Sequence, residues 1–102
     1  MPLTIKFRDG RYCPTVVCDH CAEEITDAAD GNYHWRIGLN DTDFGKQIYF
    51  THKRCCDPFE VAHKGELFMW GAMELQCFPI YLGHNMAIKW GAAVRLAAIL
   101  SM

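Results

Sequence analysis

Two short pairs of metal-ligating residues constrain this chain more than any other feature. Cys18 and Cys21 are separated by two residues, and His52 and Cys55 repeat that spacing after the intervening residues 22–51. Such a spacing lets both side chains of a pair converge on one ion from a tight turn or a first helical turn. Three thiolates and one imidazole form a tetrahedral set that Zn²⁺ accepts, with no coordination position left open. We therefore predict one structural zinc ion per chain, with these four residues as its ligands.

The size of the chain and its N-terminal sequence agree with a small fold that a metal ion stabilises. A chain of 102 residues has room for one domain, and domains this small often need a disulfide or a metal. Residues 1–11 lack the apolar core and the small-residue cleavage site of a secretory signal. We expect a cytoplasmic protein whose six cysteines stay reduced or bind metal, with a disulfide framework as the less favoured alternative.

The residues around the second pair leave two questions open. Cys56 directly follows Cys55 and is the alternative fourth ligand, although its spacing of three residues from His52 is less regular. A zinc ion with three thiolates and one imidazole carries a net charge of about −1. Lys53 and Arg54 either offset that charge through hydrogen bonds to sulfur or are solvated surface groups.

The remaining histidines and cysteines are expected outside the zinc site. His34 stands among the polar-face residues of a predicted strand, so we expect it at the surface. Free cysteine behaves as a small apolar residue that is often buried. His20 lies inside the turn between Cys18 and Cys21 and is expected in solvent, whereas His63 and His84 have no partner at ligand spacing. Cys13 and Cys77 are expected to be such ordinary small apolar residues.

Three segments have the pattern of strands. Apolar residues alternate with polar ones over residues 3–8, which predicts a half-buried strand that ends at the turn formed by Asp9 and Gly10. Residues 33–39 alternate again, and residues 48–51 are β-branched or aromatic. We expect these two segments to form an antiparallel hairpin around a loop at residues 40–46, with the second strand running into His52.

The pattern becomes helical from residue 66 onward. Leu75, Phe78 and Leu82 have helical spacing, and Pro79 either kinks this helix or lies in its first turn. A last helix over residues 88–100 is apolar nearly all round. The expected fold class is α+β within a single domain, residues 1–102, which comprises a zinc-binding hairpin unit at 12–62 and a helical part with two helices at 66–101.

The ligand pattern also resembles a known family. Cys18-x2-Cys21 followed by His52-x2-Cys55 resembles the first zinc module of a LIM domain in the identity and order of the ligands, over about residues 12–60. LIM modules usually have a shorter stretch between the pairs, and Pro58 stands where the next module's cysteines are expected. The resemblance is to a single LIM-like or treble-clef zinc finger. It implies a platform for protein interaction or nucleic-acid binding, not an enzyme.

Enzymatic readings find little support in the rest of the sequence. A redox Cys-x2-Cys motif is followed by a helix within a thioredoxin-like fold, whereas strand patterns follow Cys18 and Cys21 here. A cysteine nucleophile needs a base and an orienting group outside the metal set, and no spacing points to one. We expect a non-enzymatic zinc protein.

The partner is the least determined property. A small-residue segment at 91–93 and the surplus of apolar residues in the last helices predict a homodimer or a protein partner. The formal net charge of −2 disfavours nucleic acid, so a nucleic-acid-binding regulator remains the alternative, using a basic strip of Lys46, Lys53, Arg54 and Lys64. No membrane association is expected, because Lys89 and Arg95 interrupt the apolar C-terminus.

Overall fold

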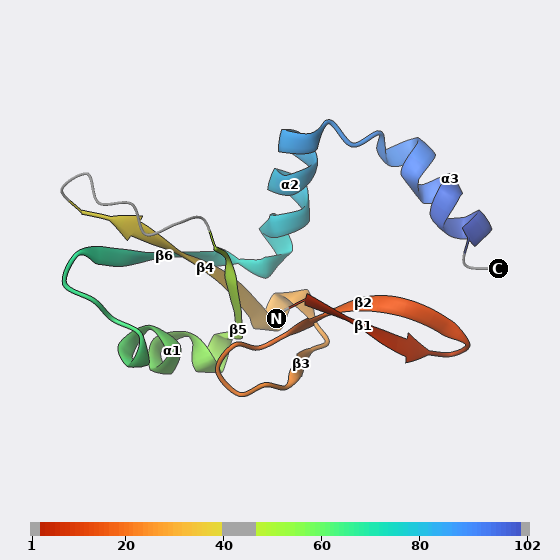
Figure 1. Cartoon of the computed structure of the whole chain (residues 1–102). Helices are drawn as coiled ribbons and strands as arrows, with labels where there is room; N and C mark the ends of the chain where they lie inside the picture. Colours follow the sequence, from red (N-terminus) through yellow and green to blue (C-terminus); the bar gives the residue numbers. More distant parts are fainter. Residues whose placement is uncertain (1–2, 40–46, 101–102) are drawn as a thin grey trace.

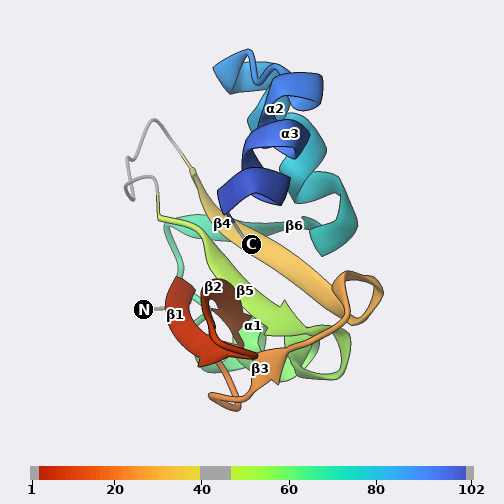
Figure 2. The same cartoon turned by 90° about the vertical axis from the view of Figure 1, so that its right-hand side faces the viewer.

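The computed structural model describes residues 3–39 and 47–100, so the expected loop at 40–46, Lys46 included, lies outside the described residues. Two antiparallel three-stranded sheets are followed by two C-terminal helices, which confirms the α+β class (Figure 1). Helix α1 (Cys56–Ala62) lies at one side of the molecule, and helices α2 (Phe78–Met86) and α3 (Trp90–Leu100) lie at the other in both views (Figure 2). Helix α1 is thus separated from the two C-terminal helices.

The first sheet contains β1 (Leu3–Arg8), β2 (Arg11–Val17) and β3 (Glu24–Ile25), in that order. Asp9 and Gly10 connect β1 to β2 with φ angles of 52° and 75°, as a two-residue turn of the type I′ class requires. The predicted strand is therefore confirmed, but its predicted burial is wrong. Every residue of β1 is exposed, and Phe7 retains 66% of its accessible surface.

The second sheet has β4 (Gly31–Gly38) at its centre, flanked by β5 (Tyr49–His52) and β6 (Phe68–Glu74). The predicted hairpin is confirmed, with Gly31 opposite His52 and His34 opposite Tyr49. Strand β6 corrects the expectation of a helical part from residue 66. Its aromatic residues favour extended backbone, and it pairs with β4 along its whole length.

Three α-helices complete the fold: α1 (Cys56–Ala62), α2 (Phe78–Met86) and α3 (Trp90–Leu100). Pro79 lies in the first turn of α2, where its missing N–H leaves no helical hydrogen bond unmade, so the first-turn alternative is the correct one. Helix α2 ends at Ala87, which has the left-handed φ of 54°. Helix α3 falls within the predicted range.

The buried interior consists of two small clusters. One joins Cys18, Ile25, Phe50, Cys55 and Leu75, so two of its members are predicted zinc ligands. The other surrounds Phe59 of α1, which is 1% exposed and has ring contacts to residues of β4, β5 and β6 at centroid distances of 5.3, 5.5 and 5.3 Å, namely His34, Tyr49 and Trp70. Neither cluster includes α3.

The C-terminal apolar residues divide between these clusters and the surface. Leu75 is buried and Phe78 packs against it. Trp90, Val94 and Leu96 of α3 are each more than half exposed. Packing within the chain therefore buries apolar residues at the start of α2, whereas those of α3 stay largely exposed.

Replacing Phe59 with alanine tests the aromatic cluster. The Phe59→Ala variant should lower the free energy of unfolding by about 3–5 kcal/mol, because it removes a buried ring and leaves a cavity. Urea denaturation of the zinc-loaded protein measures the loss. The Val61→Ala variant, at an exposed position of the same helix, should stay within about 0.5 kcal/mol of the parent. If the Phe59→Ala chain does not fold, Phe59→Leu should still show a smaller loss; no loss in either would contradict the cluster's role.

Candidate metal centre

The structure brings the four predicted ligands together from different parts of the chain. Cys18 follows β2 and Cys21 closes the next turn, while His52 ends β5 and Cys55 immediately precedes α1. Their ligand atoms all lie within 4.8 Å of one another, and three of the four residues are buried. The four side chains are thus close enough to hold a metal ion.

Hydrogen bonds within the first turn and to β5 fix the first pair. The Cys18 N–H donates to the Glu23 carbonyl at 2.9 Å, and the Ala22 N–H donates back to the Cys18 carbonyl at 3.0 Å. The Asp19 N–H donates to the Phe50 carbonyl at 2.7 Å, and the Phe50 N–H donates to the Asp19 carboxylate at 2.8 Å. These bonds hold the turn on β5 two residues before the second ligand pair begins.

Backbone donors surround the Cys18 sulfur. The N–H groups of His20, Cys21 and His52 lie 3.4, 3.5 and 3.4 Å from it. Burial raises the pKa of this thiol, but the three donors outweigh burial and lower the pKa to about 6. Burial and the neighbouring Cys18 and Cys21 sulfurs raise the pKa of Cys55 to about 11. Without an ion, the surroundings favour ionisation of Cys18 and disfavour ionisation of Cys55. A bound cation would stabilise both thiolates, so that the crowded thiols can ionise together.

The imidazole of His52 is oriented as a metal ligand. Its Nδ1 atom lies 3.4 Å from the Cys21 sulfur, and its Nε2 atom lies 3.2 Å from the Glu24 carbonyl oxygen. When Nε2–H donates to that carbonyl, the lone pair of Nδ1 faces the sulfurs. A tetrahedral zinc ion separates a sulfur and a nitrogen ligand by about 3.5 Å, given its usual bond lengths. The donor set and its spacing therefore fit zinc.

The two cations between the second-pair ligands form ion pairs with carboxylates. Lys53 pairs with Glu74, and Arg54 lies 3.4 Å from Glu23 and 3.9 Å from Asp30. The observed hydrogen bonds to the Cys18 sulfur come from backbone N–H groups instead. Stabilisation of sulfur thus depends on the fold of the two turns more than on these two side chains.

The structure separates Cys56 from the four-residue cluster. Cys56 is half-buried and forms another group with His34 and Glu60, whose ligand atoms also lie within 4.8 Å of one another. The expectation of a surface His34 is wrong, because Phe59 of α1 and Trp70 of the neighbouring strand β6 lie against its ring and leave this side chain 0% exposed. The spacing of Cys56 and Glu60, four residues apart on a helix, was the available sequence signal for this group.

Searches of protein-family models, curated proteins and solved structures found no match to this chain. Among the described residues, no helix combines the length and apolar character needed to cross a membrane. All six cysteines are free thiols. The geometry of the cysteine and histidine clusters therefore carries the functional argument.

The pKa of Cys18 predicts how zinc binding depends on pH. Zinc binds the thiolate, so protons compete with it only below the pKa of each thiol. Zinc affinity should fall between about pH 8 and pH 5, and more steeply below about pH 6, where Cys18 also takes up a proton. Competition with a chromophoric chelator across this range measures the effect. An affinity that does not change with pH would contradict thiolate ligation.

Proposed function

We propose that this protein is a non-enzymatic zinc-binding protein in which one structural zinc stabilises a small interaction module. The ligands are Cys18, Cys21, His52 and Cys55, and the module self-associates through its C-terminal helices. The observation that carries the proposal is the closed set of four converging ligands, with the imidazole of His52 held in a metal-competent orientation by the Glu24 carbonyl.

A structural role follows from the coordination number and the size of the core. Four protein ligands leave no position for water or substrate, which distinguishes structural from catalytic zinc. The buried apolar residues are few, and Cys18 and Cys55 are among them. Removing the ion would place repelling thiolates, or thiols without an ion, at the centre of this cluster. Structural zinc contributes on the order of 10 kcal/mol or more to folding in small sites.

The order of elements around the ion supports a treble-clef or LIM-like zinc finger. The first pair lies in a turn after a strand, the β4–β5 hairpin follows, and the second pair leads directly into α1. The ligand turn and the hairpin agree with the layout expected from the sequence, whereas the helix that follows the second pair was not predicted. Such units commonly act as binding platforms, which agrees with an interaction role.

Metal analysis with chelation tests the zinc site. The purified protein should hold one tightly bound zinc per chain and lose its structure cooperatively when a chelator removes it. Cys55→Ser should weaken this zinc more than about a hundredfold, because it removes a ligand and not merely a neighbour of one. Cys56→Ser should leave the tightly bound zinc in place. A metal-free protein with an unchanged melting curve would overturn the proposal.

The accessible surface of the chain supports self-association. A compact chain of this mass exposes about 5,900 Å², whereas this one exposes 7528 Å². Its radius of gyration is 15.8 Å, against about 13 Å for a compact domain of this length. The excess is about 1,600 Å² per chain, and two such surfaces together lie within the range that obligate dimers bury.

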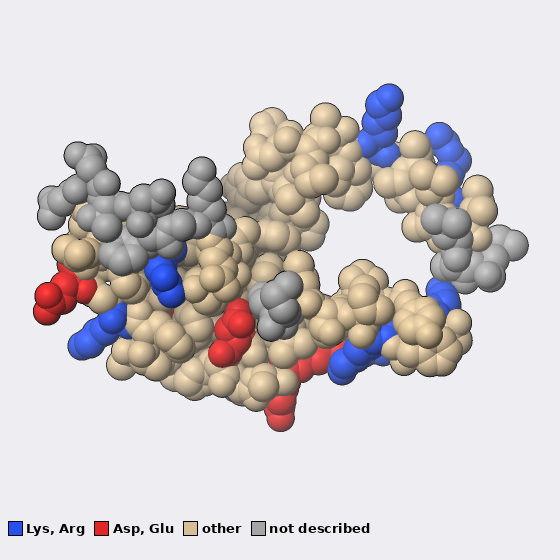
Figure 3. Space-filling model, in the orientation of Figure 1, with Lys and Arg blue, Asp and Glu red and all other residues tan. Residues whose placement is uncertain are grey.

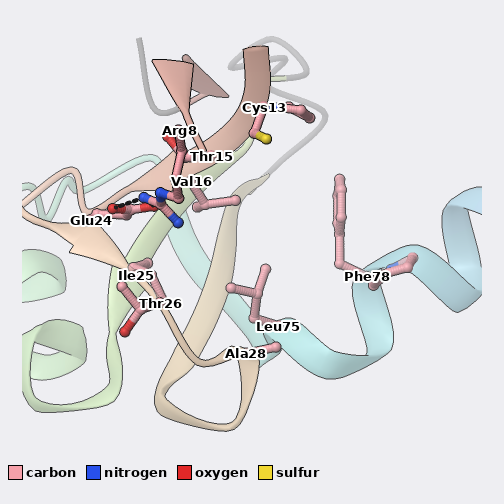
Figure 4. A pocket seen from close by; sticks show the side chains of 12 residues that line it. Arg8, Cys13, Thr15, Val16, Glu24, Ile25, Thr26, Ala28, Leu75 and Phe78 are labelled. Atoms are coloured by element: carbon pink, nitrogen blue, oxygen red, sulfur yellow. Dashed lines mark hydrogen bonds and ion pairs between the residues drawn. The ribbon is translucent and has the colours of Figure 1, made fainter. Parts of the chain in front are cut away.

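Most of the large exposed apolar residues lie on three elements, the β1–β2 hairpin, α2 and α3. The β1–β2 hairpin, α2 and α3 surround a hollow bordered mainly by uncharged residues (Figure 3). A cavity of about 400 Å³ lies between β2 and the segment that leads into α2, where Val16, Leu75 and Phe78 line it together with the Arg8–Glu24 ion pair (Figure 4). The large exposed residues on these elements are Leu3, Ile5, Phe7, Tyr12, Ile80, Tyr81, Leu82, Met86, Trp90, Val94, Leu96 and Ile99.

A second copy of this chain fits that surface best. Its own apolar elements supply a partner of matching character, and a twofold dimer would cover the same surface on both copies. Nucleic acid is less well supported, because Lys53 and Arg54 of the expected basic strip are engaged by carboxylates. The formal net charge of −2 also disfavours a phosphate backbone.

Matched valine substitutions test the dimer. Val94 in α3 and Val61 in α1 are 65% and 66% exposed. Val94→Glu should shift the protein to monomers and raise the dimer dissociation constant at least about a hundredfold, because it buries an unpaired charge. Val61→Glu should leave the dimer intact. Size-exclusion chromatography with light scattering measures both; a parent protein that is monomeric at all concentrations, with α3 folded, would refute self-association.

A further inference from the structure

A second group of ligand-type side chains lies beside the zinc cluster. Cys56 and Glu60 are four residues apart in α1, so both lie on one face of that helix. This face packs against β4, which contributes His34. One ligand atom from each of the three residues lies within 4.8 Å of the other two.

The imidazole of His34 is held by hydrogen bonds on both nitrogens. Nδ1 lies 2.8 Å from a carboxylate oxygen of Glu60, and Nε2 lies 2.8 Å from the hydroxyl oxygen of Thr51. His34 and Thr51 are each 0% exposed. With Nε2–H donated to Thr51, the lone pair of Nδ1 faces Glu60 and Cys56. His52 is oriented in the same way: its Nε2–H faces an accepting carbonyl, and its Nδ1 faces the sulfurs.

We propose that His34, Cys56 and Glu60 form a second metal site, which binds one divalent transition-metal ion of the zinc class and leaves its fourth position open to water. Three protein ligands with one open position distinguish this site from the closed four-ligand cluster. The site therefore exchanges its ion more readily than the structural one.

Charge and donor type suit such an ion. One thiolate and one carboxylate balance a charge of +2, and the imidazole adds none, so the occupied site is neutral within a half-buried environment. One adjustment concerns Nδ1 and the carboxylate oxygen of Glu60. Their separation of 2.8 Å has to lengthen to about 3.3 Å around a tetrahedral zinc. The Glu60 side chain is 28% exposed and has room to move outward.

An open cavity provides a route to the site. Glu60 borders a surface cavity of about 590 Å³ together with Asp57, Lys64 and Trp70. An ion or a water molecule can therefore reach the carboxylate side of the cluster, while Phe59 and Thr51 close its inner side. The first cluster has all four of its positions filled by protein.

Titration of Co²⁺ into protein that already holds one zinc tests this site. A second equivalent should bind and give the absorption of a cobalt ion with one thiolate ligand. Cys56→Ser should abolish the thiolate band, and Glu60→Gln, which keeps a hydrogen-bonding group beside His34, should weaken the second binding at least about tenfold. Neither variant should release the first zinc. The matched control is Cys77→Ser, which replaces another half-buried free thiol and should change nothing.

The result separates this site from the structural one. If no second equivalent of Co²⁺ binds, or if the thiolate band of cobalt persists in the Cys56→Ser variant, the three residues form only a metal-free network. If the proposed structural zinc site were wrong, the result would be different: the parent protein would contain no tightly bound metal, and a chelator would not change its structure.

Discussion

The attachment of the first ligand turn to β5 is the contact on which the rest of the structure depends. Asp19 and Phe50 exchange two hydrogen bonds across this junction, and the N–H of His52 points at the Cys18 sulfur. The two ligand pairs are thereby brought together before any ion is considered, although the thiols then crowd one another. A bound cation would relieve that crowding, and under the proposed function it stabilises a fold with few buried apolar residues among the described ones.

The start of α1 connects two chemically different clusters. Cys55 belongs to the four-residue cluster, whereas its neighbour Cys56 belongs to the group with His34 and Glu60. The chain enters α1 between these two residues.

The remainder of the molecule exposes most of its apolar residues. The β1–β2 hairpin and α3 have regular backbone but little packing within the chain, since β1 is exposed throughout and Val94 and Leu96 of α3 are more than half exposed. Apolar surface of this extent is rare on a monomer, and burying it is the usual driving force for association. The proposed division of labour is a metal-stabilised half that fixes the shape and an apolar half that makes the contact.

The sequence by itself indicated Cys18, Cys21 and His52 as candidate ligands and predicted the hairpin between the two pairs, because these follow from local spacing and backbone preference, and it left two positions open to Pro79. Only the tertiary structure decided three other features. Residues 68–74 became a strand because β4 offered them an edge to pair with. His34 became buried because Phe59 of α1 and Trp70 of β6 lie against its ring. Cys55 and Cys56 were assigned to different clusters by the direction in which the chain enters α1, and the spacing of residues along the sequence carries no information about that direction.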